Sequence, residues 1–180
     1  MVAVVSGANR GLGLELCRQL QQRGWRVVAL CRRSSPELEA LRQDCQRSSS
    51  SHVTVVEGVD ALAGVSAGLL ICSAGILSTY SMADLDTAAI RQQVEANALG
   101  PLRVAHALGA NLAPAGAKVA IVSSKMGSVA DTAQDGQNGS VGYRMSKAAA
   151  NMAGQLLALE LRQRGIPLLL IHPGTVTTGM

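Results

Sequence analysis

The sequence has 180 residues, 48% of them apolar and 16% charged, with a mean hydropathy of +0.23. A chain of this length and composition can bury a core, which excludes a disordered protein and predicts one domain spanning residues 1–180. The formal net charge of +4 lies within residues 1–47, which hold eight Arg and four acidic residues, and this local excess favours an anionic ligand. Only three aromatic residues and no Lys/Arg run argue against a nucleic-acid partner.

Short runs of β-branched and aliphatic residues alternate with longer segments of helical periodicity. This alternation is typical of βαβ units, so we expect an α/β fold with a doubly wound parallel sheet between two layers of helices. The predicted strands cover residues 2–6, 26–31, 53–57, 69–72, 118–123 and 167–172. The predicted helices cover residues 12–23, 36–46, 87–112 and 143–164, the first with Leu12, Leu16 and Leu20 on one face.

Residues 61–83 carry no charge and are long enough for a membrane-spanning helix. Ser, Gly, Ala and Thr dilute their hydropathy, however, and Asp60 and Asp84 flank them instead of Lys or Arg. The N-terminus lacks the basic and apolar regions of a signal peptide. We therefore expect no membrane association and a cytoplasmic location.

The four cysteines are widely spaced and form no C-x-x-C pair: Cys17, Cys31, Cys45 and Cys72. We therefore expect reduced thiols within the core, as in cytosolic proteins. His52 and His106 have no metal-ligand spacing with one another or with the cysteines, so no metal site is expected.

A glycine-rich turn, Gly7-x-x-x-Gly11-x-Gly13, lies between the first predicted strand and the first predicted helix. Glycines let the backbone turn tightly and approach a diphosphate, which the free N–H groups of a helix N-terminus favour. An ordinary strand–helix turn is the alternative to a dinucleotide site.

Three arginines make the prediction of the ligand more specific. Arg10 lies in the turn, and Arg32 and Arg33 follow the second strand, where a site specific for NAD would have Asp or Glu for the ribose 2′-OH. Guanidinium groups instead pair bidentately with the oxygens of a phosphate. The sequence therefore predicts NADP(H) over NAD(H), although Arg33 could also be a solvated surface residue.

Tyr143-x-x-x-Lys147 opens the last predicted helix, and residues four apart share a helix face. An ammonium group near the phenol would lower the pKa of Tyr143 from about 10 toward the working pH. The phenol would then act as general acid for a carbonyl oxygen or as general base for an alcohol. Ser123 and Ser124 end the fifth strand and would bring a hydroxyl to the same site. Considered alone, a Tyr/Lys pair at this spacing is also common as packing beside a solvated charge.

The order of these motifs resembles the short-chain dehydrogenase/reductase family along essentially the whole chain. The residues that carry the resemblance are the glycine-rich turn, Ala74-Gly75, Asn97, Ser124, Tyr143-x-x-x-Lys147 and Pro173-Gly174. Longer stretches are similar to the C-factor-like carbonyl reductases within that family: residues 6–17, 96–104 and 143–152.

The resemblance implies a Rossmann fold and hydride transfer between a nicotinamide and a small carbonyl or alcohol substrate. It implies that Tyr143 transfers the proton and that Lys147 lowers the pKa of Tyr143 and holds the nicotinamide ribose. It also implies that Ser124 orients the substrate oxygen and that Asn97 holds a proton-relay water. It implies that Asp60 meets the adenine amino group and that Val176 and Thr178, after Pro173, meet the carboxamide. The other expected cofactor-binding residues are Gly7, Asn9, Arg10, Gly11, Leu12, Gly13, Arg32, Ala74 and Gly75.

The sequence departs from the family pattern in three places. Cys72-Ser73 replaces the first two residues of Asn-Asn-Ala-Gly, and Ser73 is expected to keep one hydrogen bond of the Asn. About ten residues join Glu57 to Leu69, where the family has a helix, although the link must cross about 14 Å of sheet. We therefore expect a bare crossover that leaves one sheet face partly uncovered or displaces the third strand. The third departure is at the C-terminus, where the family pattern continues beyond Thr178 into a substrate-covering helix and a last strand that this sequence does not contain.

Two other functions are compatible with parts of the sequence. The glycine-rich turn and the arginines would also serve an NADP-binding regulatory or sensor protein without turnover. Residues 64–68, Gly-Val-Ser-Ala-Gly, match the nucleophile elbow of a hydrolase, but there a strand precedes the turn and a helix follows it. In this chain the predicted strand follows the turn, which argues against the hydrolase.

The two long predicted helices carry apolar stripes: Val94, Leu99, Leu102 and Ala105 on the first, and Met152, Leu156 and Leu159 on the second. In the family such helices pair across subunits, which implies a homodimer or homotetramer. Burial against the chain's own sheet is the alternative.

Overall fold

A computed structural model gives the fold and describes residues 1–47, 52–112 and 116–176. Six parallel strands form one sheet in the order β3-β2-β1-β4-β5-β6. The order reverses between β1 and β4, so the predicted doubly wound α/β sheet is confirmed. The predicted strand bounds are confirmed to within one residue: β1 Val2–Ser6, β2 Arg26–Cys31, β3 Val53–Glu57, β4 Leu69–Cys72, β5 Lys118–Val122 and β6 Leu168–Ile171.

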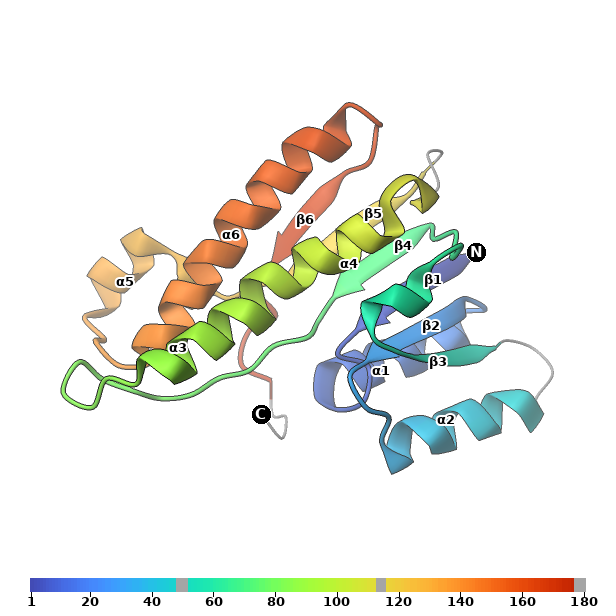
Figure 1. Ribbon diagram of the computed structural model, residues 1–180, viewed down its shortest axis with the longest axis horizontal. Helices are drawn as coiled ribbons and strands as arrows, with labels where there is room; N and C mark the ends of the chain where they lie inside the picture. Colours follow the sequence, from blue (N-terminus) through green and yellow to red (C-terminus); the bar gives the residue numbers. More distant parts are fainter. Residues whose placement is uncertain (48–51, 113–115, 177–180) are drawn as a thin grey trace.

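Helices lie on both faces of the sheet (Figure 1). Helices α1 (Gly11–Gln22) and α2 (Pro36–Arg47) pack on one face with a cluster that includes Val5. Helices α4 (Gly100–Leu108) and α6 (Val141–Arg162) pack on the other face with a cluster that includes Val4. Successive strand residues therefore enter opposite cores, which confirms the three-layer arrangement.

The buried face of α1 is rotated by part of a turn from the face that carries Leu12, Leu16 and Leu20. Leu14, Cys17 and Leu20 are buried, whereas Leu12 and Leu16 are only half-buried. The reason lies at the start of the helix, where Gly13 is pressed against the turn after β1. Because this contact sets the rotation of the helix, Cys17, one turn further on, faces the sheet.

The long helix predicted over residues 87–112 is interrupted. It consists of α3 (Thr87–Val94), a π-helical segment η2 (Glu95–Leu99), α4 and a 3-10 turn η3 (Gly109–Asn111). Pro101 has no N–H, so it cannot donate to the carbonyl of Asn97 four residues earlier. The N–H of Gly100 donates to the carbonyl of Glu95, five residues back. The proline thus favours the wider π turn.

Two short helical segments after β5 were not predicted: the 3-10 turn η4 (Lys125–Gly127) and α5 (Val129–Asp135). Ser124 caps the first and Ser128 caps the second, each accepting a hydrogen bond from a backbone N–H. Neither segment is long enough to show an apolar periodicity, so the sequence pattern could not reveal them.

The link from β3 to β4 is the bare crossover expected from its length. Its only regular piece in the described chain is a 3-10 turn, η1 (Val59–Leu62), whose Leu62 is fully buried in the core. The third strand is not displaced, since Val53 pairs with Val27 of β2. On the face of β3 where a helix could pack, Thr54 is exposed and Val56 is half-buried, so this edge is partly uncovered.

Residues 64–68, the sequence that matches a nucleophile elbow, connect η1 to β4. A strand follows this turn and a 3-10 turn precedes it, so the order is opposite to that of a hydrolase elbow. In the described part of the chain, no helix combines the length and the apolar character needed to cross a bilayer. All four cysteines are buried and free, as expected.

Helix α6 packs on the sheet through other residues, and its predicted apolar stripe faces outward, so burial of that stripe against the chain's own sheet is wrong. The exposed fractions are 63% for Met152, 59% for Leu156 and 52% for Leu159. The stripe on the first helix is divided, with Ala105 buried in the core and Leu99 exposed. The outward stripe of α6 forms an apolar surface on the helix face away from β5 and β6.

Arg164 ties the end of α6 to the end of α4. Its guanidinium donates to the carbonyl oxygens of Gly109, Ala110 and Leu112, at 3.1, 3.5 and 3.0 Å. These carbonyls follow the last turn of α4, where helical partners are missing.

We expect Arg164→Ala to lower the free energy of unfolding by about 2 kcal/mol, since it removes charged hydrogen bonds to partly buried carbonyls. Urea unfolding of the wild type and the variant measures this difference. Arg162→Ala is the matched control, because Arg162 is exposed on the same helix. Equal losses in the two variants would contradict the role of the Arg164 contacts.

Candidate active site

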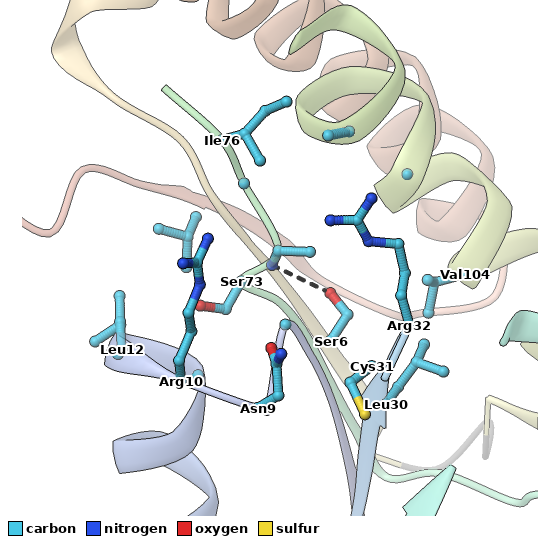
Figure 2. A pocket seen from close by; sticks show the side chains of 18 of the residues that line it. Ser6, Asn9, Arg10, Leu12, Leu30, Cys31, Arg32, Ser73, Ile76 and Val104 are labelled. Atoms are coloured by element: carbon cyan, nitrogen blue, oxygen red, sulfur yellow. Dashed lines mark hydrogen bonds between the residues drawn. The ribbon is translucent and has the colours of Figure 1, made fainter. Parts of the chain in front are cut away.

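A cavity of about 1170 Å³ opens at the carboxyl ends of the strands, where the strand order reverses. Ligands of doubly wound sheets bind at this position. The segments that follow β1, β2, β4, β5 and β6 all contribute to its lining. Figure 2 shows part of this lining, with side chains from the turns after β1 and β2 facing the segment after β4.

The glycine-rich turn after β1 has no room for side chains at two of its glycines. A Cβ on Gly13 would lie 2.1 Å from the carbonyl oxygen of Gly7, and a Cβ on Gly7 would lie 2.6 Å from the Cα of Ala74. Gly7 and Gly11 also have positive φ angles, of 70° and 54°. The turn therefore forms a bare backbone surface at the start of α1, which fits a diphosphate.

Arginine side chains surround this end of the cavity. Arg10 and Arg32 extend into it from the turns after β1 and β2 (Figure 2), and Arg33 also contributes to the lining. The structure brings the three predicted arginines to one cavity, and their role in binding a 2′-phosphate stays a prediction. Such a group of cations fits an anionic ligand larger than a diphosphate alone.

Strand β4 is braced differently from the expectation. Ser73 makes no hydrogen bond within the described residues and lines the cavity instead. The hydroxyl of Ser6 in β1 accepts a hydrogen bond from the N–H of Ala74 at 3.4 Å. Burial raises the pKa of the neighbouring Cys72 thiol to about 12, so this position stays neutral. The hydrogen bond expected of Ser73 is therefore not made among the described residues, and the Ser6 hydroxyl ties β1 to the segment after β4.

Tyr143, Lys147 and Ser124 lie together at the other end of the cavity. Tyr143 and Lys147 lie on the first turns of α6, and the Lys147 ammonium is 5.6 Å from the centre of the Tyr143 ring. Lys147 Nζ donates to the carbonyl of Val122 at 2.8 Å. Gly127 lets the segment that carries Ser124 pack on α6, because a Cβ there would lie 2.5 Å from the backbone of Lys147.

The pKa of Tyr143 moves opposite to the expectation. Burial raises it, and a hydrogen bond with Ser124 lowers it by a smaller amount. Burial also lowers the pKa of Lys147 to about 8. The phenol therefore stays protonated at neutral pH in this site, which suits a proton donor.

Asn97 lies behind the cavity wall and is 1% exposed. Its Oδ1 accepts from the N–H of Ile76, and its Nδ2 donates to the Ile76 carbonyl and the Ser146 hydroxyl, at distances of 2.8, 2.9 and 2.8 Å. Both amide hydrogens are thus in use. A relay water at Asn97 would have to donate to an oxygen atom of this residue.

The remaining predicted site residues divide into two groups. Asn9, Leu12, Gly75, Pro173 and Val176 line the cavity. Asp60 is exposed on η1 and does not line the cavity, although its neighbour Val59 does. Thr178 lies outside the described residues.

One wall of the cavity was missed by sequence reasoning. It comes from the flank of α3, η2 and α4 that faces the short crossover, with Gln92, Glu95, Gly100, Arg103 and Val104. Arg103 donates to Glu95 at 2.7 Å. A charge pair eight residues apart gives no recognisable signal in the sequence. Among residues 1–47, 52–112 and 116–176, no cluster of His, Cys, Asp and Glu could hold a metal ion.

The sequence and the structure are similar to known proteins over nearly the whole chain. A family model described as short chain dehydrogenase matches residues 1–180. The 1-hydroxy-2-glutathionyl-2-methyl-3-butene dehydrogenase of Rhodococcus sp. (strain AD45) is 38% identical over 183 residues, which cover 98% of this chain and 78% of that protein. The C-signal protein of Myxococcus xanthus is 42% identical over 114 residues, 62% of this chain and 67% of that protein. The structure of NADPH-bound carbonyl reductase from chicken fatty liver matches with a TM-score of 0.85 and 25% identity, covering 99% of this chain and 81% of that one.

Burial of Lys147 makes stability depend on pH in a predictable direction. Burial lowers the pKa of Lys147 in the folded chain to about 8, whereas its ordinary pKa is 10.5. Between pH 8 and pH 10.5 the unfolded chain therefore binds more protons than the folded chain. Stability from this group therefore rises with pH across that window. We expect the unfolding free energy of the wild type, relative to Lys147→Met, to rise by about 3 kcal/mol from pH 7 to 10.5.

Urea unfolding at several pH values measures this difference. Lys125→Met is the matched control, because it removes an exposed lysine on η4. A flat difference for Lys147→Met would contradict the lowered pKa.

Proposed function

The chain belongs to the short chain dehydrogenase family of oxidoreductases, and on that premise we propose that it is an NADP(H)-dependent carbonyl reductase. It would transfer hydride between a nicotinamide and a small carbonyl or alcohol substrate. One observation carries the proposal: a bare glycine turn with arginines and a Tyr143–Lys147–Ser124 group line one cavity. We propose that residues 1–180 form one NADP-binding Rossmann domain.

Most of the proposed cofactor-binding residues line the cavity; Asp60, Asn97 and Thr178 do not belong to the described lining. Backbone N–H groups of the glycine-rich turn would hold the diphosphate, and Arg32 would hold the 2′-phosphate. Lys147 and Tyr143 would hold the nicotinamide ribose. The other residues are Gly7, Asn9, Arg10, Gly11, Leu12, Gly13, Asp60, Ala74, Gly75, Asn97, Pro173, Val176 and Thr178. NADPH-bound and NADP-bound relatives of similar fold support this cofactor.

Three side chains would carry out the proton chemistry. When bound, NADPH supplies the hydride to the carbonyl carbon. Ser124 donates a hydrogen bond to the carbonyl oxygen and fixes its position beside Tyr143. Tyr143 gives its proton to that oxygen, and the Lys147 ammonium stabilises the phenolate that remains. A phenol kept neutral by burial supports the reductive direction.

An NADP-binding regulatory protein without turnover is the second candidate. The likeness to the C-signal protein of Myxococcus xanthus favours it, because that protein is named for signalling. A regulator needs the glycine-rich turn and the arginines but not the Tyr143–Lys147–Ser124 group. Turnover of a carbonyl substrate therefore separates the two functions.

We also propose that the chain forms a homodimer or homotetramer through the outward stripe of α6. Met152, Leu156 and Leu159 are each more than half exposed, which is unusual for three large apolar residues on one helix face. The four free, buried cysteines support a reducing compartment, the cytoplasm.

We expect Tyr143→Phe to reduce kcat with NADPH by about 10³-fold across a panel of aldehydes and ketones, since it removes only the proton donor. The Kd for NADPH should rise by no more than about tenfold, the effect of one lost hydrogen bond to the ribose. Tyr80→Phe, at the other tyrosine of the chain, is the matched control. A wild type that binds NADPH but reduces no carbonyl of the panel would favour the regulatory candidate.

We expect Arg32→Ala to weaken NADPH binding about 30-fold and NADH binding less than twofold, because NADH lacks the 2′-phosphate. Titration calorimetry with each dinucleotide measures both values. Arg26→Ala is the control, since Arg26 is exposed at the opposite end of the same strand. Equal losses for the two dinucleotides would contradict a phosphate contact at Arg32.

A further inference from the structure

The four residues between β2 and α2 separate two cavities. Arg32 and Arg33 line the main cavity, and Arg32 extends into it (Figure 2). Ser34, the next residue, lines a second cavity of about 370 Å³ together with Glu39 and Glu57. The Arg32 guanidinium thus lies on the cofactor side of the segment, and the carboxylates of Glu39 and Glu57 lie on the opposite side.

Both donors of Ser34 are bound to carboxylates. Its N–H donates to Glu57 Oε1 at 2.7 Å, and its hydroxyl donates to Glu39 Oε1 at 2.6 Å. The other oxygen of Glu39 accepts from Arg42 at 2.7 Å. The bonds from Ser34 and Arg42 lower the pKa of Glu39, so it stays charged. Hydrogen bonds to charged acceptors are shorter and stronger than neutral ones, so they fix the position of Ser34.

Ser35 anchors the same segment to the glycine-rich turn. Its hydroxyl donates to the carbonyl of Asn9 at 2.6 Å and accepts from the N–H of Leu38 at 3.2 Å. The second bond caps the start of α2. The segment is therefore held at three points, on the turn after β1, on α2 and on β3.

Glu57 brings its carboxylate from the end of a paired strand. It is the last residue of β3, it lies opposite Cys31 in the sheet, and the N–H of Gly58 donates to the Cys31 carbonyl at 3.1 Å. The position of its carboxylate is therefore tied to the position of β2. This makes Glu57 the contact that relates the segment to the sheet itself.

We propose that Glu57 is a positioning residue for the choice between NADPH and NADH. By holding the Ser34 N–H from the opposite side, it keeps Arg32 directed toward the main cavity. Because both donors of Ser34 are already used, the guanidinium groups, and not this N–H or hydroxyl, bind the 2′-phosphate. The inference rests on the proposed NADP(H) cofactor.

Titration calorimetry of the full chain with NADPH and with NADH tests this role. We expect Glu57→Leu, which removes the acceptor, to weaken NADPH binding about tenfold and NADH binding less than twofold. Glu57→Gln keeps an acceptor and should bind NADPH within about threefold of the wild type. Glu37→Leu is the control for the loss of one negative charge nearby, because Glu37 is exposed in the first turn of α2.

Glu57→Asp keeps the charge but shortens the side chain, and it replaces Glu57→Leu as the test if that variant does not fold. We expect Glu57→Asp to show the same selective loss of NADPH binding. Equal losses for both dinucleotides would overturn the proposal, since Glu57 would then support the whole site. Unchanged or tighter NADPH binding in Glu57→Leu would also overturn it. A wild type without preference for NADPH contradicts the proposed cofactor, and this inference with it. A preference that survives in Glu57→Leu and Glu57→Asp contradicts the role of Glu57 alone.

Discussion

The side-chain amide of Asn97 is the contact on which the arrangement of the site depends. It is buried, and its three hydrogen bonds join the backbone of Ile76, after β4, to the hydroxyl of Ser146 on α6. Ser146 in turn donates to the carbonyl of Tyr143 at 2.8 Å. A continuous set of hydrogen bonds thus links the segment after β4 to the first turns of α6, which carry Tyr143. Inside a protein, an apolar side chain at Asn97 would leave several polar groups unpaired, so the position admits few substitutes.

The interrupted helix explains how this amide reaches both partners. Pro101 removes the helical bond to the Asn97 carbonyl, and the π-helical segment Glu95–Leu99 replaces the regular turn. The same segment carries Glu95, which pairs with Arg103 at the wall of the cavity. Pro101, within the helix predicted over residues 87–112, therefore contributes to the shape of one side of the site.

Much of this architecture could be predicted from the sequence, because strands and turns are local features. Runs such as Val2–Ser6 are short and rich in β-branched residues, and closely spaced glycines such as Gly7 and Gly11 favour a tight turn after such a run. The interruption near Asn97 had a local signal in Pro101, but its geometry depends on partners far along the chain. The raised pKa of Tyr143 had no such signal, since burial of the ring follows from how α6 packs on the sheet. The expectation that the short link from β3 to β4 has no covering helix was correct, because it followed from the strand order and the length of the link alone.

The distribution of charge connects the basic first quarter of the chain with the cavity. Of its arginines, Arg18, Arg42 and Arg47 form ion pairs with acidic residues three positions earlier on the surfaces of α1 and α2. Such pairs offset charge locally and contribute little to stability. Arg10, Arg32 and Arg33 line the cavity. Three of the four acidic residues among residues 1–47 are thus paired on the helices, while three of the eight arginines lie around the cavity that the glycine-rich turn borders. Because a concave site with charge of one sign attracts the opposite sign from a distance, this partition favours a multiply charged anion there before any specific contact forms.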